Sequence, residues 1–226
     1  MEHIYKAVAA ARAELAAAAI ASKRDPSEVT LLAATKTRTA DEVRAVLAAG
    51  ADAAGENRAQ ELGEKLGQGA YGETKPHFIG ALQTNKVKLV AGRAALIHSV
   101  DSVRLGSAIG SFASARNITQ DVLIEINIGG EANKSGVAAH GAEALAGELY
   151  KIPGLRVRGA MAIPPEGAGA KRYFSEMREL FLRLKASAPA GFDVLSMGMS
   201  ADFREAVAEG STLVRLGSIL FGPRVY

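Results

Sequence analysis

The sequence has no cysteine, no tryptophan and only 7 prolines, and aromatic side chains make up 5% of its 226 residues. Without cysteine there is no disulfide framework, no thiolate-bound metal and no cysteine nucleophile. No apolar run reaches the roughly 18 residues of a membrane span, and 23% of the residues are charged. These absences exclude disulfide-rich and membrane-spanning classes, and we expect a cytoplasmic protein with no membrane partner.

Apolar residues are plentiful enough for a full core. They form 48% of the chain, which excludes a disordered protein. Lysine and arginine number 27 against 24 aspartate and glutamate, so the net charge is only +3, with the two signs interspersed. This balance gives little support to nucleic-acid binding, which we do not expect. At roughly 150 residues per domain, we predict a single domain spanning residues 1–226, and we expect a monomer.

The N-terminal segment resembles the apolar part of a secretory signal only superficially. Arg12 and Glu14 interrupt the alanine-rich stretch of residues 7–21, and no convincing cleavage site follows it. Apolar side chains recur there at helical spacing: Ile4, Val8, Ala11 and Leu15. The pattern predicts an amphipathic first helix.

Short apolar runs then alternate with helical segments along the chain. The predicted strands are residues 29–35, 53–57, 76–80, 96–101, 121–128, 155–163, 192–199 and 212–217. The predicted helices between or after them are residues 39–50, segments ending near 67, 92 and 117, and residues 138–150, 170–186 and 201–209. Eight such units predict a (β/α)8 TIM barrel with an extra N-terminal helix. An open doubly wound sheet is the competing α/β fold, but no Gly-x-Gly-x-x-Gly fingerprint follows the first strand.

The chemistry of a barrel lies at the carboxyl ends of its strands, so polar residues there are the candidates for a site. They are Lys36, Asn57, Asn127, Ser200, Arg215 and Ser218. Lys36 directly ends an apolar strand, and burial beside such walls lowers the pKa of a lysine. A deprotonated amine forms a Schiff base with a carbonyl compound. The pattern is equally compatible with an ordinary solvated lysine.

The loops after the last two strands have the composition of an anion site. Ser200 precedes a predicted helix, and Gly217 and Ser218 follow the eighth strand, where barrels commonly bind phosphate. Ser200 alone is also compatible with a plain helix N-cap. Arg215 lies between two apolar residues, and strand parity does not fix which way it points, but a buried partner is favoured over solvent.

The histidines and carboxylates give little evidence for a second kind of site. The four histidines show no metal-ligand spacing, and we predict no metal site. Glu125 and Asp101 are candidate carboxylates, but no pair is spaced for acid-base work, and helix capping explains Asp101.

Ordered motifs from about residue 30 to 224 resemble one family. They are Thr35-Lys36-Thr37, Gly55-Glu56-Asn57, His77-Phe78-Ile79-Gly80, Asn133-Lys134-Ser135-Gly136, Ser196-Met197-Gly198-Met199-Ser200 and Val214-Arg215-Leu216-Gly217. The sequence is similar to the pyridoxal phosphate homeostasis proteins, the YggS and PROSC group.

The resemblance implies an alanine racemase-type barrel that binds pyridoxal 5′-phosphate (PLP) as a Schiff base on Lys36. It places Ser200, Gly217 and Ser218 on the phosphate, Arg215 at the pyridine nitrogen and Asn57 near the cofactor. It further implies that the protein holds PLP and helps supply it to PLP-dependent apoenzymes, without robust turnover and with no catalytic residues. Arg38 stands where the family often has a second lysine, which makes Lys134 the candidate for any secondary PLP contact.

Three other functions remain open at this point. A weak PLP-dependent amino-acid racemase would use the same lysine, although racemisation in this fold needs a tyrosine from an additional β domain, and none of the five tyrosines follows a predicted strand. A cofactor-free barrel aldolase would use Lys36 on a keto substrate. Nucleic-acid binding is the least specific of the three.

Overall fold

Eight parallel strands form a closed barrel in this computed structural model, which describes residues 1–165, 167 and 169–222. The end of the predicted 1–226 domain therefore lies outside the described residues. The barrel strands are β1 (Thr30–Ala34), β2 (Ala53–Glu56), β3 (His77–Phe78), β4 (Leu96–Val100), β5 (Gln120–Asn127), β7 (Leu155–Ala162), β8 (Val194–Ser196) and β9 (Leu213–Leu216). They pair in the order β4-β3-β2-β1-β9-β8-β7-β5, and the β4–β5 pairing closes the ring. The predicted TIM barrel is confirmed.

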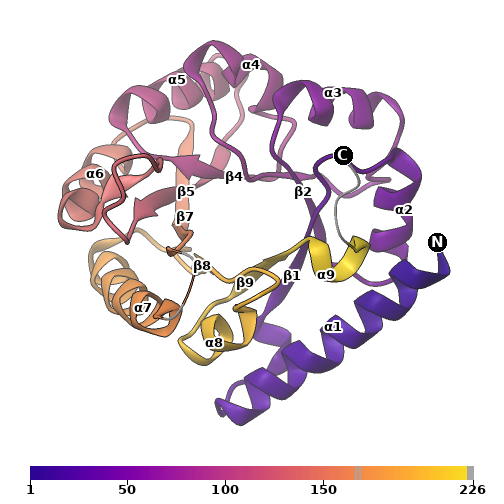
Figure 1. Ribbon diagram of the computed structural model, residues 1–226. Helices are drawn as coiled ribbons and strands as arrows, with labels where there is room; N and C mark the ends of the chain where they lie inside the picture. Colours follow the sequence, from indigo (N-terminus) through magenta and orange to yellow (C-terminus); the bar gives the residue numbers. More distant parts are fainter. Residues whose placement is uncertain (166, 168, 223–226) are drawn as a thin grey trace.

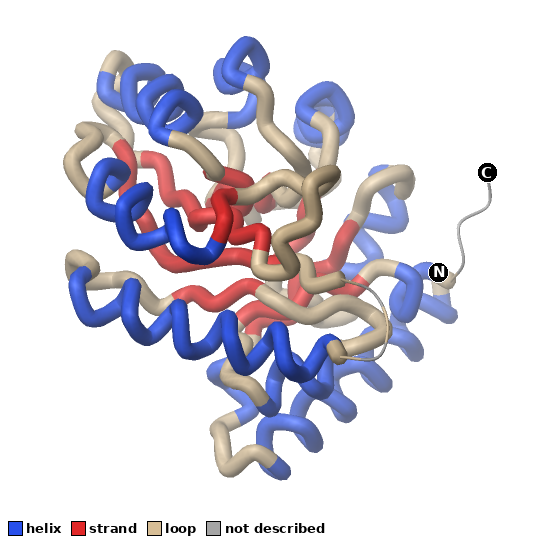
Figure 2. The backbone as a smooth tube through the Cα atoms, turned by 60° about the vertical axis from the view of Figure 1, so that its left-hand side comes forward, coloured by secondary structure: helices blue, strands red, loops and turns tan. Residues whose placement is uncertain are grey.

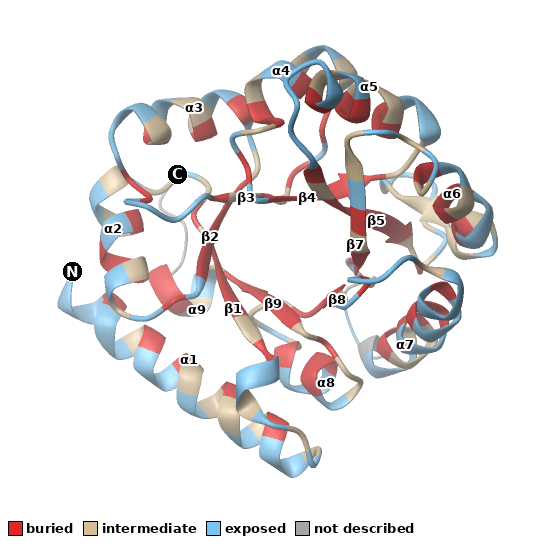
Figure 3. Ribbon diagram, turned by 180° about the vertical axis from the view of Figure 1, so that it is seen from behind, coloured by how far each residue is buried: buried red, intermediate tan, exposed pale blue. Residues whose placement is uncertain are grey.

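Helices surround the ring of strands, as Figures 1 and 2 show. They are α1 (Glu2–Ala21), α2 (Ala40–Ala48), α3 (Ala59–Gly67), α4 (Val87–Val90), α5 (Val103–Ser114), α6 (Ala142–Leu149), α7 (Ala170–Ser187), α8 (Phe203–Ala208) and α9 (Ser218–Phe221). Their buried faces turn toward the barrel and their exposed faces away from it (Figure 3). None of the described helices is long and apolar enough to cross a membrane.

The predicted N-terminal helix is present and packs outside the ring, against α2, α8 and α9 (Figure 1). Its apolar stripe is buried as the spacing predicts, with Ile4 and Val8 at 0% exposure and Leu15 at 4%. These side chains pack with strand residues such as Leu31 and Val214 in one hydrophobic cluster. The extra helix thus closes the outer surface of β1 and β9, the two strands that lead to Lys36 and Arg215.

Several predicted boundaries were wrong. The strand expected at 192–199 ends at Ser196, because Gly198 adopts a left-handed φ of +94° that breaks the extended chain. The segment expected to be helical up to residue 92 holds only a 3-10 turn at Thr84–Lys86 and the four-residue α4. The helix expected from residue 138 begins at Ala142, since Val137–Ala138 form a short strand, β6, paired with the end of β5.

Candidate functional site

The strand register settles the direction of Arg215, which the sequence left open. Leu213 packs inside the barrel with Leu32 and Ala53. Because side chains alternate along a strand, Arg215 points to the same face as Leu213, two residues earlier. Arg215 pairs in register with Leu32 and is 5% exposed. The guanidinium group therefore lies inside the barrel, above an apolar layer.

A cavity of about 420 Å³ opens at the carboxyl ends of β1, β8 and β9. It brings together five of the six residues predicted to bind a cofactor: Lys36, Ser200, Arg215, Gly217 and Ser218. Lys36 follows β1 and Ser200 follows β8, whereas the other three lie at the end of β9 or just after it. The first and last of the five are more than 180 residues apart in the sequence. Asn57, the sixth, is not among the described lining residues; it follows β2, the strand next to β1.

The cavity carries charge of one sign. Lys36, Arg38 and Arg215 line it, and none of the described lining residues is acidic. The Arg38 guanidinium carbon, Cζ, lies 5.0 Å from the centroid of the Phe221 ring. Arg38 Nη1 is 3.5 Å from Glu42 Oε1. Since basic side chains line this partly enclosed space and none of its described lining residues is acidic, the site favours a negatively charged ligand.

Ser200 does not cap the helix that follows it, so the N-cap alternative for this residue was wrong. Helix α8 begins at Phe203 with Asp202 as its N-cap residue. The Ser200 hydroxyl instead accepts hydrogen bonds from the amides of Gly217 and Ile219, at 3.2 and 3.4 Å. It therefore lies at the start of α9 and joins the loops after β8 and β9.

Arg215 is held by oxygen atoms of Ser196 at the end of β8 and Ala162 at the end of β7. One terminal nitrogen, Nη1, donates to the carbonyl and hydroxyl oxygens of Ser196, at 3.0 and 2.6 Å, and Nη2 donates to Ala162 O at 3.1 Å. These bonds use three of the five N–H groups of a guanidinium, which leaves the Nε–H and one Nη2–H for a ligand. Burial lowers the pKa of Arg215 to about 10, so the group is still a cation near neutral pH.

Two histidines extend this hydrogen-bonded chain down the barrel interior. His98 Nδ1 lies 3.2 Å from Ser196 Oγ, and His98 Nε2 lies 3.0 Å from His77 Nδ1. Burial holds the pKa of His98 well below its ordinary value, and the nearby charges of His77 and Arg215 act in the same direction. His77 reaches a second cavity, of about 640 Å³, at the opposite end of the barrel. This chain was not predicted from the sequence, where its signal is a histidine, His98, in the middle of an apolar strand.

Asn57 has an unusual environment for a polar side chain. Its Oδ1 atom is buried and has no hydrogen-bond partner within the described structure. Gly80 allows the backbone to approach here, because a Cβ atom on residue 80 would lie 2.2 Å from Asn57 O. A buried acceptor without a donor is costly unless a ligand or water satisfies it.

Asn127 and Lys134 lie at a separate, smaller cavity of about 260 Å³. Asn127 holds a loop there, because its Nδ2 donates to Glu131 O at 2.8 Å and its Oδ1 accepts from Glu131 N at 3.1 Å. Lys134 Nζ is paired with Glu131 at 2.5 Å. Glu125 also lines this cavity; burial raises its pKa, and Ser135 donates to it at 2.6 Å.

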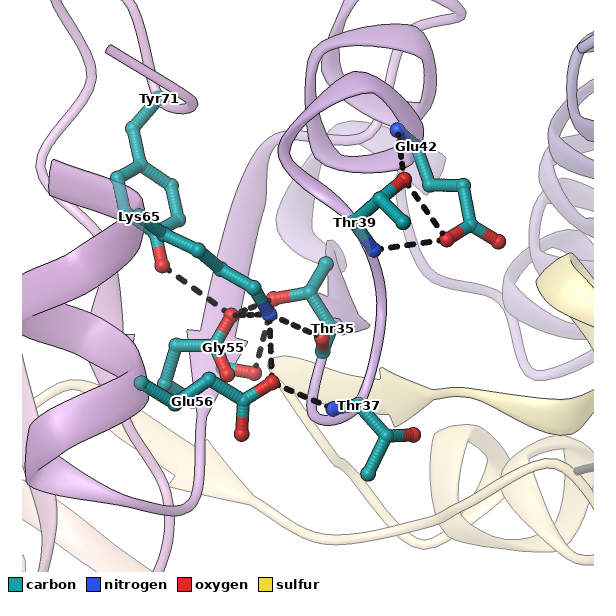
Figure 4. Close-up of polar contacts among 9 residues, drawn as sticks. Thr35, Thr37, Thr39, Glu42, Gly55, Glu56, Lys65 and Tyr71 are labelled. Carbon is teal, nitrogen blue, oxygen red and sulfur yellow. Dashed lines mark hydrogen bonds and ion pairs between the residues drawn. The ribbon is translucent and has the colours of Figure 1, made fainter. Parts of the chain in front are cut away.

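A buried ion pair beside the Lys36 loop was not predicted at all. Lys65 Nζ lies 2.8 Å from Glu56 Oε1, and the two side chains are 6% and 0% exposed. Thr35 and Tyr71 donate hydrogen bonds to the same carboxylate oxygen, at 2.6 and 3.1 Å (Figure 4). The two charges are nine residues apart in the sequence and on different elements, so no local spacing rule finds them.

Comparison with known proteins decides the family. Residues 10–225 match the family described as "Alanine racemase, N-terminal domain". The pyridoxal phosphate homeostasis protein of Aquifex aeolicus is 42% identical, with 87% of each chain covered, and that of Pseudomonas aeruginosa is 40% identical, covering 100% of this chain and 98% of the relative. This chain belongs to the pyridoxal phosphate homeostasis protein family. The resemblance seen in the sequence motifs is confirmed.

A solved relative has the same fold. The structure of PipY from Synechococcus elongatus with PLP bound superimposes with a TM-score of 0.82 at 30% identity, covering 97% of this chain and all of PipY.

Proposed function

We propose that this chain binds PLP through a Schiff base to Lys36 and takes part in PLP homeostasis and supply, without robust turnover. The observation that carries the proposal is the cavity of about 420 Å³ in which Lys36, Arg38 and Arg215 meet with no acidic side chain among the described lining residues. Its volume is in the range of roughly 300–1,000 Å³ typical of small-molecule sites. A cytoplasmic monomer, formed by one domain over residues 1–226, completes the proposal.

The residues present fit the cofactor. Lys36 supplies an amine that adds to an aldehyde carbon with loss of one water, and Ser200, Gly217 and Ser218 would hold the phosphate. Arg215 would donate to the pyridine nitrogen. Asn57 would lie near the ring, and its buried, unpartnered Oδ1 favours a donor from a ligand or an ordered water.

The same residues argue against strong catalysis. Bound PLP supplies an electrophilic carbon and an electron-withdrawing ring. Arg215 keeps its proton near neutral pH, because its pKa is about 10, and it therefore leaves a facing ring nitrogen unprotonated and weakens that withdrawal. No tyrosine is among the described residues that line the cavity, so these residues supply no phenolic acid-base group opposite Lys36.

A weak amino-acid racemase is the second candidate, favoured by the match to the alanine racemase N-terminal domain family. It uses the same cavity and the same lysine, so binding experiments alone do not separate it from a carrier. A turnover number in the ordinary enzyme range of about 1–1,000 per second would establish it.

The test is borohydride reduction of the purified protein with PLP, followed by peptide mass mapping and paired with the visible absorption spectrum. We expect one phosphopyridoxyl group on Lys36, and none there in Lys36→Ala. Lys134→Ala is the matched control and should leave the Lys36 label intact. Absence of label from the wild-type protein at excess PLP would refute the proposal. Transfer of unreduced PLP to a PLP-dependent apoenzyme, followed by recovery of that enzyme's activity, tests the supply role.

A further inference from the structure

The two residues that flank Lys36 are both tied to one side-chain cluster. Lys65 Nζ donates to the carbonyl oxygen of Thr35 at 2.7 Å, and Glu61 Oε1 accepts from the amide of Thr37 at 2.6 Å. Figure 4 shows the Lys65 ammonium group aimed at Thr35, with Thr37 on the same loop. The backbone is therefore fixed on each side of Lys36 by groups from outside its own loop.

Every donor of the Lys65 ammonium group in this cluster is used. Lys65 Nζ lies 2.7–2.8 Å from three acceptors, which are Thr35 O, Glu56 Oε1 and Glu61 Oε1. An ammonium group has three donors, so each has a partner. Lys65 is 5% exposed and Glu56 0%, which means that water does not compete strongly for these bonds. Three short hydrogen bonds from one buried ammonium group therefore hold Thr35, Glu56 and Glu61 together, although Glu56 Oε2 has no hydrogen-bond partner within the described structure.

The conformation of Thr37 shows that this support is needed. Its φ is +64°, in the left-handed region that a β-branched residue rarely occupies. The hydrogen bond from its amide to the Glu61 carboxylate is charge-assisted and short, and it stabilises this turn. The capping box of Thr39 and Glu42 then fixes the chain at the start of α2.

We infer that Glu61 is a positioning residue, which acts with Lys65 to hold the backbone of Lys36 so that its amine is presented to the cavity. The inference rests on the proposed function, since it concerns how Lys36 reaches PLP. Glu61 does not line that cavity among the described residues, so it acts through the Thr37 amide rather than by touching the ligand. Pre-organisation of this kind increases affinity by reducing the ordering required at the moment of binding.

The test compares two ligands that differ only at the reactive carbon. PLP carries the aldehyde that Lys36 attacks, whereas pyridoxine 5′-phosphate has the same ring and phosphate without it. In Glu61→Ala we expect PLP affinity to fall by about tenfold, the equivalent of one charge-assisted hydrogen bond. Affinity for pyridoxine 5′-phosphate should stay at the wild-type value, because the phosphate and ring contacts are untouched.

Two further variants distinguish a positioning role of Glu61 from a general loss of structure around helix α3. Glu61→Gln keeps an oxygen acceptor for the Thr37 amide and should retain most of the PLP affinity. Glu64→Ala removes an exposed carboxylate from the same helix and should match the wild type for both ligands.

Equal PLP affinity in Glu61→Ala and wild type would overturn the inference, as would a parallel loss for both ligands, which would show a merely structural role. These results are distinct from failure of the proposed function, in which the wild-type protein itself forms no Schiff base at Lys36.

Discussion

Arg215 and His98 meet at a single hydroxyl group, that of Ser196, from opposite sides of the barrel interior. Arginine only donates, so Ser196 Oγ accepts from Nη1, and its single proton is available to His98 Nδ1. In the tautomer that accepts this proton, a neutral His98 carries its own proton on Nε2, which faces His77 Nδ1 at 3.0 Å. Arg215, Ser196, His98 and His77 thus form one continuous polar chain through the barrel interior.

Ser196→Ala tests this arrangement. The variant leaves the buried Arg215 Nη1 and His98 Nδ1 without their shared partner, and we expect the free energy of unfolding to fall by about 1–3 kcal/mol. Ser99→Ala is the matched control, because Ser99 is 3% exposed and its Oγ has no hydrogen-bond partner within the described structure. Urea unfolding of the two apoproteins provides the comparison. A loss of equal size in both would contradict the proposed chain.

The two histidines also predict a pH dependence. Burial lowers the pKa of His77 to about 4 and that of His98 well below its ordinary value, whereas both have a pKa near 6.5 when unfolded. Between these limits the unfolded state binds more protons, so these groups make the protein less stable as pH falls from about 6.5 to 4. Each unit of pKa shift corresponds to about 1.4 kcal/mol.

Urea unfolding of wild type and His77→Gln across this pH range measures the effect. We expect the wild-type free energy of unfolding to fall more steeply with acidification than that of the variant. Comparison of the two proteins removes the contributions of buried carboxylates such as Glu56 and Glu125, whose raised pKa values act in the opposite direction. Parallel curves would show that His77 takes up its proton equally in the folded state.

The sequence predicted the residues that line the cavity better than it predicted the hydrogen-bonded residues that support them. Lys36, Ser200 and Arg215 each lie near the carboxyl end of an apolar strand, and strand ends of a parallel barrel converge in space, so topology brings them together. The supports depend on contacts that no local pattern encodes. His98 and Ser196 are 98 residues apart.

Some predicted boundaries of helices and strands were wrong for a related reason. The chain at 137–138 becomes a strand because β5 offers an unpaired edge there, and pairing across space overrides the helix predicted from local sequence. The direction of Arg215 likewise required the register with β1, since parity depends on where a strand is taken to begin.

The Lys65–Glu56 pair predicts a strongly non-additive response to mutation. Lys65→Met leaves the Glu56 carboxylate buried without its cation, and we expect a loss of about 3–5 kcal/mol in unfolding free energy. Adding Glu56→Gln to this variant removes the orphaned charge and should recover most of the loss. A double-mutant cycle by chemical denaturation measures the coupling. Simple addition of the two single effects would show that the pair contributes little beyond its packing.

Two glycines at the carboxyl ends of the strands should respond to the same substitution in opposite ways. A Cβ atom at Gly80 would lie 2.2 Å from Asn57 O, whereas one at Gly217 would lie no closer than 3.6 Å to its nearest neighbour, Ala34 Cβ. Gly80→Ala must therefore displace backbone, with an expected loss of about 1–3 kcal/mol or more. Gly217→Ala should change the stability of the apoprotein by no more than about 0.5 kcal/mol.

The effect of Gly217→Ala should be on the ligand instead. Both Gly217 and Ala34 line the Lys36 cavity, so the added methyl group would occupy space where a phosphate approaches the backbone. We expect the affinity for PLP and for pyridoxine 5′-phosphate to fall together, by about tenfold or 1.4 kcal/mol. Titration of the wild-type and variant apoproteins with both ligands measures it. Unchanged affinity for both ligands would show that the phosphate does not bind against Gly217, because a methyl group and an anion cannot occupy the same position.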